Sequence, residues 1–230
     1  MALTTRVIIP AFNEEGAVGK VIQDIPKNLV AEIIVVDNAS TDNTTLVAQN
    51  AGATVIQEKR KGYGSACLKG IAYINSLSDQ TDIVLFIDAD YSDYPKEMNL
   101  VLAPIVDQKY DLVIGSRALG NKERGSMTFP QIFGNWLATR LLKLLYNCTF
   151  TDLGPFRAIK LESLNSLEMR DTNYGWTVEM QLKAAKKGLK SIEVPVNYRV
   201  RVGHSKISGT VKGTITAGYK ILWTIFKYAI

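Results

Sequence analysis

The chain has 230 residues, of which 47% are apolar and 21% charged, and its formal net charge is +5. This length supports one sizeable hydrophobic core, and the composition excludes a disordered chain, a collagen-like repeat and a disulfide-rich scaffold. The charge is unevenly distributed, because residues 1–182 carry 17 basic and 21 acidic side chains whereas residues 183–230 carry 10 and 1. The basic character therefore belongs to the last fifth of the chain.

The sequence predicts neither secretion nor a membrane-spanning segment. The apolar stretch near the N-terminus is too short for a signal peptide, and acidic residues follow it directly. Cys67 and Cys148 form no paired pattern, so we expect two buried thiols in a reducing, cytoplasmic environment. Basic residues interrupt both candidate apolar segments, 132–146 and 215–230, before either reaches the length of a transmembrane helix.

The first half of the chain alternates short β-branched runs with segments of helical spacing. The expected strands are 6–9, 32–36, 53–56, 83–87 and 112–114, and the expected helices are 15–25, 43–51, 64–77 and 95–108. This alternation predicts an α/β fold with a mostly parallel central sheet and helices on both faces. In such a sheet, ligands bind beyond the carboxyl ends of the strands.

The pattern loosens after residue 117, and the expected elements become longer and more basic. They are a helix at 130–147, an irregular segment at 151–157, a helix at 176–187, a strand within 190–199, a basic loop at 201–209 and a final helix at 211–229. Neither a linker nor an internal repeat is visible. We therefore expect one domain at 1–210, followed by an amphipathic helix at 211–230.

Asp88-Ala89-Asp90 carries the strongest chemical signal in the sequence. The triplet follows the apolar run 83–87, so a buried strand delivers two carboxylates to the expected ligand edge of the sheet. Such oxygen ligands suit Mg²⁺ or Mn²⁺, which would bridge the phosphate oxygens of a nucleotide. Taken by itself, the triplet fits a turn with a helix cap equally well.

Two further loops are expected at the same edge. Asp37 ends the second strand, where its carboxylate can accept hydrogen bonds from a base or a ribose, whereas Ser40 and Asp42 are explained as helix caps. Gly62-Tyr63-Gly64 opens a helix after a basic run, so its backbone could meet a phosphate. A flexible turn explains these glycines at least as well.

Together these motifs resemble the inverting GT-A glycosyltransferases of family 2. The resemblance is carried, in order and spacing, by Val7–Glu15, Val35–Asp42, Gly62–Gly64 and Asp88–Asp90, and downstream by Gly115–Arg117, Asp152–Arg157 and Arg201–Lys206. It runs from about residue 5 to 212. Within the family, the chain looks most like the dolichyl-phosphate mannose and glucose synthases and the bacterial polyprenyl-phosphate glycosyltransferases.

The resemblance implies a single GT-A domain that moves a hexose from UDP-glucose or GDP-mannose to a polyprenyl or dolichyl phosphate. The implied donor-nucleoside pocket consists of Pro10, Phe12, Glu14, Val36 and Asp37. The residues implied at the diphosphate and at an Mg²⁺ or Mn²⁺ ion are Asp88, Ala89 and Asp90, with Asp88 and Asp90 as the metal ligands and Arg117 on the donor. The implied phosphate and acceptor contacts are Arg157, Arg201 and Lys206.

The chain departs from the family pattern at two positions. Family members often have Asp-Asp-Gly-Ser where this chain has Asp37-Asn38-Ala39-Ser40. The basic loop is also one residue shorter than in the mannose synthases, so the role implied for Arg201 could belong to Arg199.

Asp152 lies where relatives with sugar acceptors keep a general base, but an anionic phosphate acceptor needs none. His204 is the only histidine and a weaker candidate for that base.

The basic C-terminal part suggests where the protein works. In the final helix, Lys220, Thr224 and Lys227 form a narrow polar stripe beside a wide apolar face. This pattern is typical of a helix in the headgroup region of a membrane, although packing against the domain or a second copy also explains it. Helix 130–147 could add a second lipid-facing surface, and the lysines of 176–190 are interpreted as a solvated face. We expect a peripheral protein on the cytoplasmic face of the membrane, with a homo-oligomer or a membrane-protein partner left open.

Other functions fit the sequence less well. The main alternative is transfer to a hydroxyl of a glycan or soluble acceptor, with Asp152 as the base. A nucleic-acid-binding module could use the basic tail, but no groove-reading motif is present and the rest of the chain is acidic. A sugar-nucleotide pyrophosphorylase or a Rossmann dehydrogenase would need a Gly-rich loop where this chain has Pro10–Glu14.

Overall fold

The structure is a computed structural model that describes residues 3–203 and 211–228. Within these residues, seven strands form one sheet in the order β3-β2-β1-β4-β6-β5-β7. The strands are β1 (Thr5–Ala11), β2 (Glu32–Asp37), β3 (Thr54–Gln57), β4 (Ile83–Phe86), β5 (Leu112–Ser116), β6 (Arg157–Lys160) and β7 (Ser191–Pro195). All neighbouring pairs are parallel except those that involve β6, which confirms the mostly parallel sheet.

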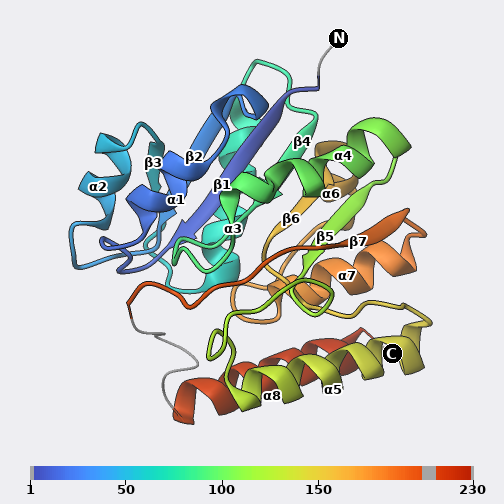
Figure 1. Cartoon of the computed structure of the whole chain (residues 1–230). Coiled ribbons are helices and arrows are strands. Elements are labelled where there is room, and N and C mark those ends of the chain that lie inside the picture. The colour runs from blue at the N-terminus through green and yellow to red at the C-terminus, as the bar shows by residue number, and fades with distance from the viewer. Residues whose placement is uncertain (1–2, 204–210, 229–230) are drawn as a thin grey trace.

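Helices cover both faces of this sheet, as Figure 1 shows. The α-helices are α1 (Val18–Asp24), α2 (Thr44–Asn50), α3 (Tyr63–Ser76), α4 (Met98–Gln108), α5 (Phe129–Tyr146), α6 (Leu161–Leu167), α7 (Trp176–Lys186) and α8 (Val211–Lys227). Two short 3₁₀ turns, Lys27–Leu29 and Pro95–Glu97, complete the elements. Helices α1, α2 and α4 share one core with the sheet, and α3, α6 and α7 share the other.

The alternation of side chains along β1 shows why both faces must be covered. Val7 and Ile9 belong to one core, and Ile8 between them belongs to the other. All three are fully buried, as expected of a central strand in a sheet with helices on both sides. Cys67 lies in the second core, and both cysteines are free and buried, which agrees with the sequence prediction.

Strand β6 and helix α6 were not predicted from the sequence. β6 has only four residues and runs antiparallel between β4 and β5, with Phe86 paired to Arg157. A run that contains a buried Arg157 and ends at Lys160 lacks the β-branched pattern on which the strand prediction relied. Because β6 is antiparallel, its beginning lies at the ligand edge of the sheet. The segment that precedes it, Asp152–Phe156, is thereby brought beside the end of β4.

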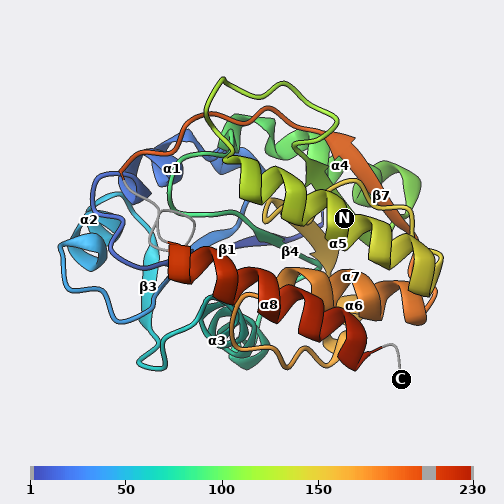
Figure 2. The ribbon, with the colours of Figure 1, turned by 90° about the horizontal axis from the view of Figure 1, so that it is seen from below.

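Helices α5 and α8 form an additional layer below the sheet, where they lie side by side (Figures 1 and 2). A third apolar cluster joins them to α7, with Leu142 from α5, Leu182 from α7 and Ile225 from α8 buried in it. Their outer sides expose large apolar residues, which are Phe129, Ile132, Phe133, Trp136, Leu144 and Leu145 on α5 and Ile215, Tyr219, Trp223 and Phe226 on α8. One face of α8 therefore packs against the domain while another stays exposed.

Of the lysines in 176–190, Lys186, Lys187 and Lys190 are exposed, as the solvated-face interpretation expected, whereas Lys183 is only partly exposed. Lys183 forms an ion pair with Glu179 at 2.8 Å, and its Nζ also lies 5.3 Å from the centre of the Tyr228 ring. Lys186 hydrogen-bonds the Tyr228 carbonyl. These two lysines thus hold the end of α8, because their long side chains reach across the gap between the helices.

None of the helices in residues 3–203 and 211–228 is long and apolar enough to cross a membrane.

Gly62 and Gly64 are required by the close approach of another segment and not by a phosphate. A Cβ atom on Gly62 would lie 2.1 Å from the Thr172 carbonyl oxygen, and one on Gly64 would lie 2.1 Å from that of Asp171. Ser65, in the first turn of α3, donates its backbone N–H to the Thr172 oxygen at 3.0 Å. The sequence allowed a phosphate contact at the start of α3. The Ser65 N–H there is instead hydrogen-bonded to the Thr172 carbonyl of the protein itself.

Replacing Gly64 by Ala should destabilise the fold by about 1–3 kcal/mol, because the added methyl group would overlap a backbone oxygen that cannot move alone. Thermal and urea unfolding measure this. Gly134→Ala is the matched control, since a Cβ there meets nothing and the position is inside α5. The control should leave stability unchanged or raise it by up to about 1 kcal/mol. Equal effects of the two substitutions would contradict the packing argument.

Candidate active site

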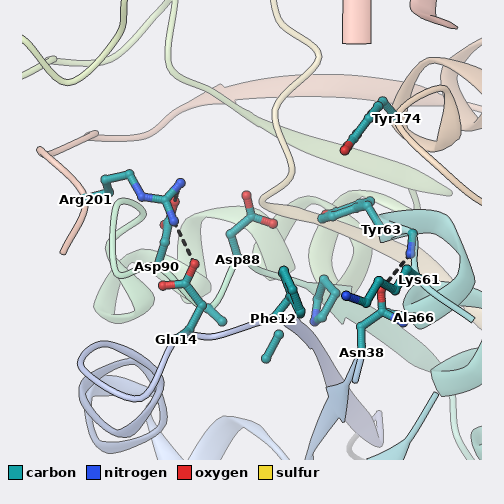
Figure 3. Close-up of a pocket in the computed structure, with 14 residues that line it drawn as sticks. Phe12, Glu14, Asn38, Lys61, Tyr63, Ala66, Asp88, Asp90, Tyr174 and Arg201 are labelled. Atoms are coloured by element: carbon teal, nitrogen blue, oxygen red, sulfur yellow. Dashed lines mark hydrogen bonds and ion pairs between the residues drawn. The ribbon is translucent and has the colours of Figure 1, made fainter. Parts of the chain in front are cut away.

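A cavity of about 280 Å³ opens where β1, β2 and β4 end. Its lining residues, which Figure 3 draws, are Pro10, Ala11, Phe12, Glu14, Asn38, Lys61, Gly62, Tyr63, Ala66, Asp88, Ala89, Asp90, Tyr174 and Arg201. Of the implied donor residues, Pro10, Phe12, Glu14, Asp88, Ala89 and Asp90 are thus brought together as expected. The cavity lies at the carboxyl ends of parallel strands, where the ligand sites of such sheets are found.

Asp88 and Asp90 occupy one wall of this cavity and differ in their surroundings. Asp90 Oδ1 accepts hydrogen bonds from the Ser92 backbone N–H at 2.9 Å and from its hydroxyl at 2.5 Å. Asp88 Oδ1 is buried and has no hydrogen-bond partner among the residues that the structure describes. Burial, followed by the repulsion from Asp90, raises the pKa of Asp88 to about 7. The pair therefore concentrates negative charge that a cation can neutralise.

Arg201 supplies one such cation. Its guanidinium forms ion pairs with Glu14 at 2.7 Å and with Asp90 at 3.1 Å (Figure 3). Arg199, the alternative left open by the sequence, lies outside the cavity lining, with its guanidinium 3.4 Å from the centre of the Tyr91 ring. Of the two arginines, Arg201 is therefore the one that lies in the cavity, and its phosphate contact stays a prediction. Lys206 and His204 lie outside the described residues.

Asp37 is buried at the end of β2 but does not line the cavity. Its carboxylate accepts hydrogen bonds from the Ser40 backbone, the Thr45 hydroxyl and the Gln57 amide, at 3.0, 2.6 and 3.1 Å. Burial raises the pKa of Asp37, but these hydrogen bonds outweigh it and hold the pKa below its ordinary value. The carboxylate thus stabilises the loop after β2, and Val36 beside it is likewise absent from the lining. Neither residue lines the cavity, and the nucleoside contacts implied for them stay predictions.

Asn38 and Lys61, which were not predicted as site residues, complete one wall of the cavity. Asn38 bonds the 58–62 loop through both ends of its amide, since it donates to the Glu58 and Arg60 carbonyls and accepts from the Gly62 N–H. Lys61 lies over the Phe12 ring at 4.9 Å. Asn38 and Lys61 adjoin motifs that were recognised, so their position in the sequence could have suggested them.

Two tyrosines bound the rest of the cavity, and Figure 3 shows both. The Tyr63 hydroxyl is buried without a hydrogen-bond partner in the described part of the chain, and burial followed by the charge of Asp88 raises its pKa well above the usual value. Tyr174 comes from the segment before α7, far from the other motifs in sequence. No sequence signal pointed to it, because its contact depends on how residues 171–173 pack against α3.

Arg117 and Asp152 form a buried ion pair beside this cavity. The Arg117 guanidinium donates to both carboxylate oxygens at 2.8 and 2.7 Å, and its backbone N–H adds a third bond at 2.8 Å. Burial opposes the charge on Arg117, but Asp152 raises the pKa of the guanidinium well above its ordinary value. Arg117 also lowers the pKa of Asp88, against the larger effects of burial and Asp90. The pair thus lies close to the acidic wall.

Arg157 is fully buried and makes no contact with either cavity described here. Its guanidinium donates to the carbonyls of Leu153, Gly154 and Thr177, and burial lowers its pKa to about 10. The acceptor contact that the resemblance implied for Arg157 is therefore not what the structure shows. Instead, Arg157 fixes the backbone that follows Asp152.

A second cavity, of about 420 Å³, opens on the other side of Asp152. Its walls come from α5, from the loop before α5 and from residues 149–152. The side chains combine cations, apolar groups and small polar groups: Lys122, Arg140, Lys143, Ile132, Trp136, Phe150, Met127, Asn135, Thr139, Thr149 and Thr151, with Ala118 and Asp152 completing the lining. Positive charge beside apolar wall suits an anionic, amphiphilic ligand.

Two carboxylates are the available ligands for a metal ion. No group of three or more His, Cys, Asp or Glu side chains gathers into a metal site among residues 3–203 and 211–228. Mg²⁺ is commonly held by one or two carboxylates together with substrate phosphates, and Asp88 and Asp90 match this pattern. The partnerless oxygen of Asp88 fits a metal contact as well. The residues present therefore fit a divalent ion that is completed by a diphosphate.

Comparison with known proteins identifies relatives over nearly the whole chain. The family model described as glycosyl transferase family 2 matches residues 6–167. An uncharacterized glycosyltransferase of Mycobacterium tuberculosis is 35% identical over 218 residues, which cover 92% of this chain and 93% of that protein. A dolichyl-phosphate hexose transferase of Haloferax volcanii is 32% identical over 206 residues, covering 87% and 85%.

Among solved structures, the chain is similar to the glucosyl-3-phosphoglycerate synthase of Mycobacterium tuberculosis. The TM-score is 0.79 at 25% sequence identity, and the match covers 99% of this chain and 80% of the other. That structure is a complex with Mn²⁺, UDP-glucose and phosphoglyceric acid. The similarity confirms the expected fold class.

Replacing Asp88 by Asn should stabilise the metal-free protein at alkaline pH. Because the folded-state pKa of about 7 exceeds the ordinary 3.8, the charged carboxylate destabilises the fold above pH 7, and this penalty disappears as the pH falls toward 4. We expect the variant to be more stable by about 1–3 kcal/mol at pH 8 and to converge with the original protein near pH 4. Urea unfolding in the presence of a chelator measures the difference. A gain that does not change with pH would contradict the assignment.

Proposed function

Because the chain belongs to glycosyl transferase family 2, we propose that it moves a hexose from a nucleoside-diphosphate sugar to a polyprenyl phosphate, with inversion, at the cytoplasmic surface of a membrane. The donor is UDP-glucose or GDP-mannose, and the reaction uses Mg²⁺ or Mn²⁺. A relative named for a dolichyl-phosphate acceptor supports the choice of a lipid phosphate.

The first cavity is proposed as the donor site. Asp88 and Asp90 would hold the divalent ion, which would neutralise negative charge on the departing diphosphate when bound. Arg201 lies against Asp90 and Glu14, so its guanidinium is placed to bind a phosphate of the donor. Phe12 and Lys61 line the part of the cavity that would take the nucleoside. The complex of a structural neighbour with Mn²⁺ and UDP-glucose supports this assignment.

One observation carries the choice of acceptor: the second cavity combines cations with an apolar wall on a helix that also exposes an aromatic face. Arg140 and Lys143 line the cavity with the Trp136 side chain, and the exposed residues Phe129 and Phe133 lie on the same helix. A phosphate could bind the cations while a hydrocarbon chain follows the apolar side of α5.

The state of Asp152 also favours a phosphate acceptor. A general base needs a carboxylate that can reach the proton it removes. Asp152 is 1% exposed, and both of its oxygens accept hydrogen bonds from Arg117. A phosphate is already anionic at neutral pH, so it can attack the anomeric carbon without a base while the bond to the diphosphate oxygen breaks. In this proposal Asp152 positions Arg117, and Arg117 binds phosphate.

A soluble anionic acceptor is the second candidate. The structural neighbour with phosphoglyceric acid is a glucosyl-3-phosphoglycerate synthase, and the cations of the second cavity would suit such a compound too. A hydroxyl acceptor of this kind would require Asp152 to leave Arg117 and act as the base.

Replacing Asp152 by Asn separates the two acceptors. We expect transfer to a polyprenyl phosphate to fall by no more than about tenfold, because only the position of Arg117 is perturbed, whereas loss of a base lowers transfer to a hydroxyl by about a hundredfold or more. Rates with polyprenyl phosphate and with phosphoglycerate, each with Mn²⁺ and both donors, provide the measurement. Asp90→Asn, which removes a proposed metal ligand, is the inactive control. A hundredfold loss with the lipid acceptor would refute the base-free reaction.

Replacing Phe133 and Phe226 by Ser should weaken binding to vesicles that contain phosphatidylglycerol. Both aromatic rings are about half exposed on the outer sides of α5 and α8, so the substitutions remove apolar contact with lipid while leaving the core intact. We expect vesicle affinity to fall about tenfold or more. Leu46→Ser is the control, because Leu46 is equally exposed but lies on α2. Sedimentation with vesicles that shows the same loss for the control would contradict a dedicated lipid face.

A further inference from the structure

Among the residues that the structure describes, helix α8 contacts residues 170–175, whose Tyr174 lines the donor cavity. The proposed reaction gives this contact no role. We propose that α8 positions this segment, and that it thereby sets the affinity of the protein for its nucleotide. The inference rests on the proposed function only for the identity of the nucleotide. The supporting contacts join residues 170–175 to the donor cavity and α3 on one side, and to α8 on the other.

On its inner side, the segment forms part of the donor site. Tyr174 lines the cavity, and in Figure 3 it lies across from Phe12. The Thr172 carbonyl accepts hydrogen bonds from the Ser65 backbone at 3.0 Å and from the Ser65 hydroxyl at 3.2 Å. The same carbonyl fills the space above Gly62, whose neighbours Lys61 and Tyr63 are cavity residues. A shift of the segment would therefore move both the Tyr174 wall and the start of α3.

On its outer side, the segment is held by three residues of α8 and its end, Lys220, Thr224 and Tyr228. Lys220 Nζ lies 3.6 Å from a carboxylate oxygen of Asp171. A Cβ atom on Gly175 would lie 2.3 Å from the Thr224 hydroxyl oxygen, so the helix and the segment touch there without room for a methyl group. These positions recur every four residues, which places them on one face of the helix.

The third contact is made through Glu179, a residue of α7 whose side chain is fully buried. Its carboxylate accepts hydrogen bonds from the backbone N–H groups of Arg170 and Asp171, at 3.0 and 2.7 Å. The Tyr228 hydroxyl donates to the same carboxylate at 2.6 Å, and Lys183 forms an ion pair with it at 2.8 Å. The end of α8 is thereby connected to the first residues of the segment. Most of the polar stripe on α8 thus faces the domain.

The opposite side of α8 carries the exposed Tyr219, Trp223 and Phe226. One helix therefore has the proposed lipid-facing side and the side that supports the donor wall. Because the helix packs as a rigid element, a shift of α8 against the domain must displace the contacts of Lys220, Thr224 and Tyr228 together. These residues act on the nucleotide through the segment and are positioning residues.

The test compares Tyr228→Phe and the double variant Lys220→Met/Tyr228→Phe with the original protein. Calorimetric titration with UDP and with GDP, each with MnCl₂, measures affinity for whichever nucleotide binds. We expect affinity to fall about three- to tenfold in the double variant, and less in Tyr228→Phe, which removes a single oxygen atom. Hydrogen exchange should accelerate in peptides covering 60–66 and 170–175 but not in β1. With an active donor, KM should rise with little change in kcat.

Two controls distinguish positioning from general destabilisation. Gly218→Ala changes α8 where an added Cβ meets nothing, and it should leave affinity and exchange unchanged. Lys220→Arg/Tyr228→Phe keeps the charge opposite Asp171 and should bind nucleotide as tightly as Tyr228→Phe alone. Unchanged exchange at 60–66 and 170–175 in the double variant would overturn the proposal. If neither nucleotide binds the original protein, the proposed function fails, and the exchange measurement still decides the role of α8.

Discussion

The burial of Asp88 at the end of β4, together with the repulsion from the Asp90 carboxylate, is the constraint around which the charged groups of the site are arranged. Both acids lie in a partly desolvated wall, where like charges raise each other's free energy. Two arginines lower this cost, because Arg117 and Arg201 both act on Asp88. Each arginine is held in turn by a second acid, Asp152 for Arg117 and Glu14 for Arg201. The result is an alternation of negative and positive side chains around the proposed metal and diphosphate site.

This arrangement also explains how one sheet provides two cavities. The antiparallel strand β6 begins at the ligand edge, so the residues before it, including Asp152, lie beside the end of β4. Asp152 lines the second cavity, and its partner Arg117 acts on the acids of the first. In the proposed reaction, the donor and the acceptor would therefore bind on opposite sides of this ion pair. Arg157 holds the backbone after Asp152 in place, because its guanidinium donates to the carbonyls of residues 153 and 154.

The sequence predicted the elements that depend on local pattern and missed those that depend on distant contacts. The parallel strands were visible as β-branched runs, and Asp88 and Asp90 as carboxylates at the end of one of them. β6 has four residues and gains its place only from its neighbours, so no local pattern marked it. Asp37 has the position of a ligand contact, but polar neighbours from α2 and β3 occupy its carboxylate. Tyr174 enters the site because two glycines admit the segment that carries it.

The central claim is that the chain makes a lipid-linked sugar at a site where the acceptor needs no base. Mass spectrometry of the lipid formed from undecaprenyl phosphate, with Mn²⁺ and UDP-glucose and GDP-mannose offered together, tests this claim most directly. The account predicts a product heavier than the lipid by one hexose residue, with release of the matching nucleoside diphosphate. Hexose transfer to phosphoglycerate, with the lipid recovered unchanged, would contradict it.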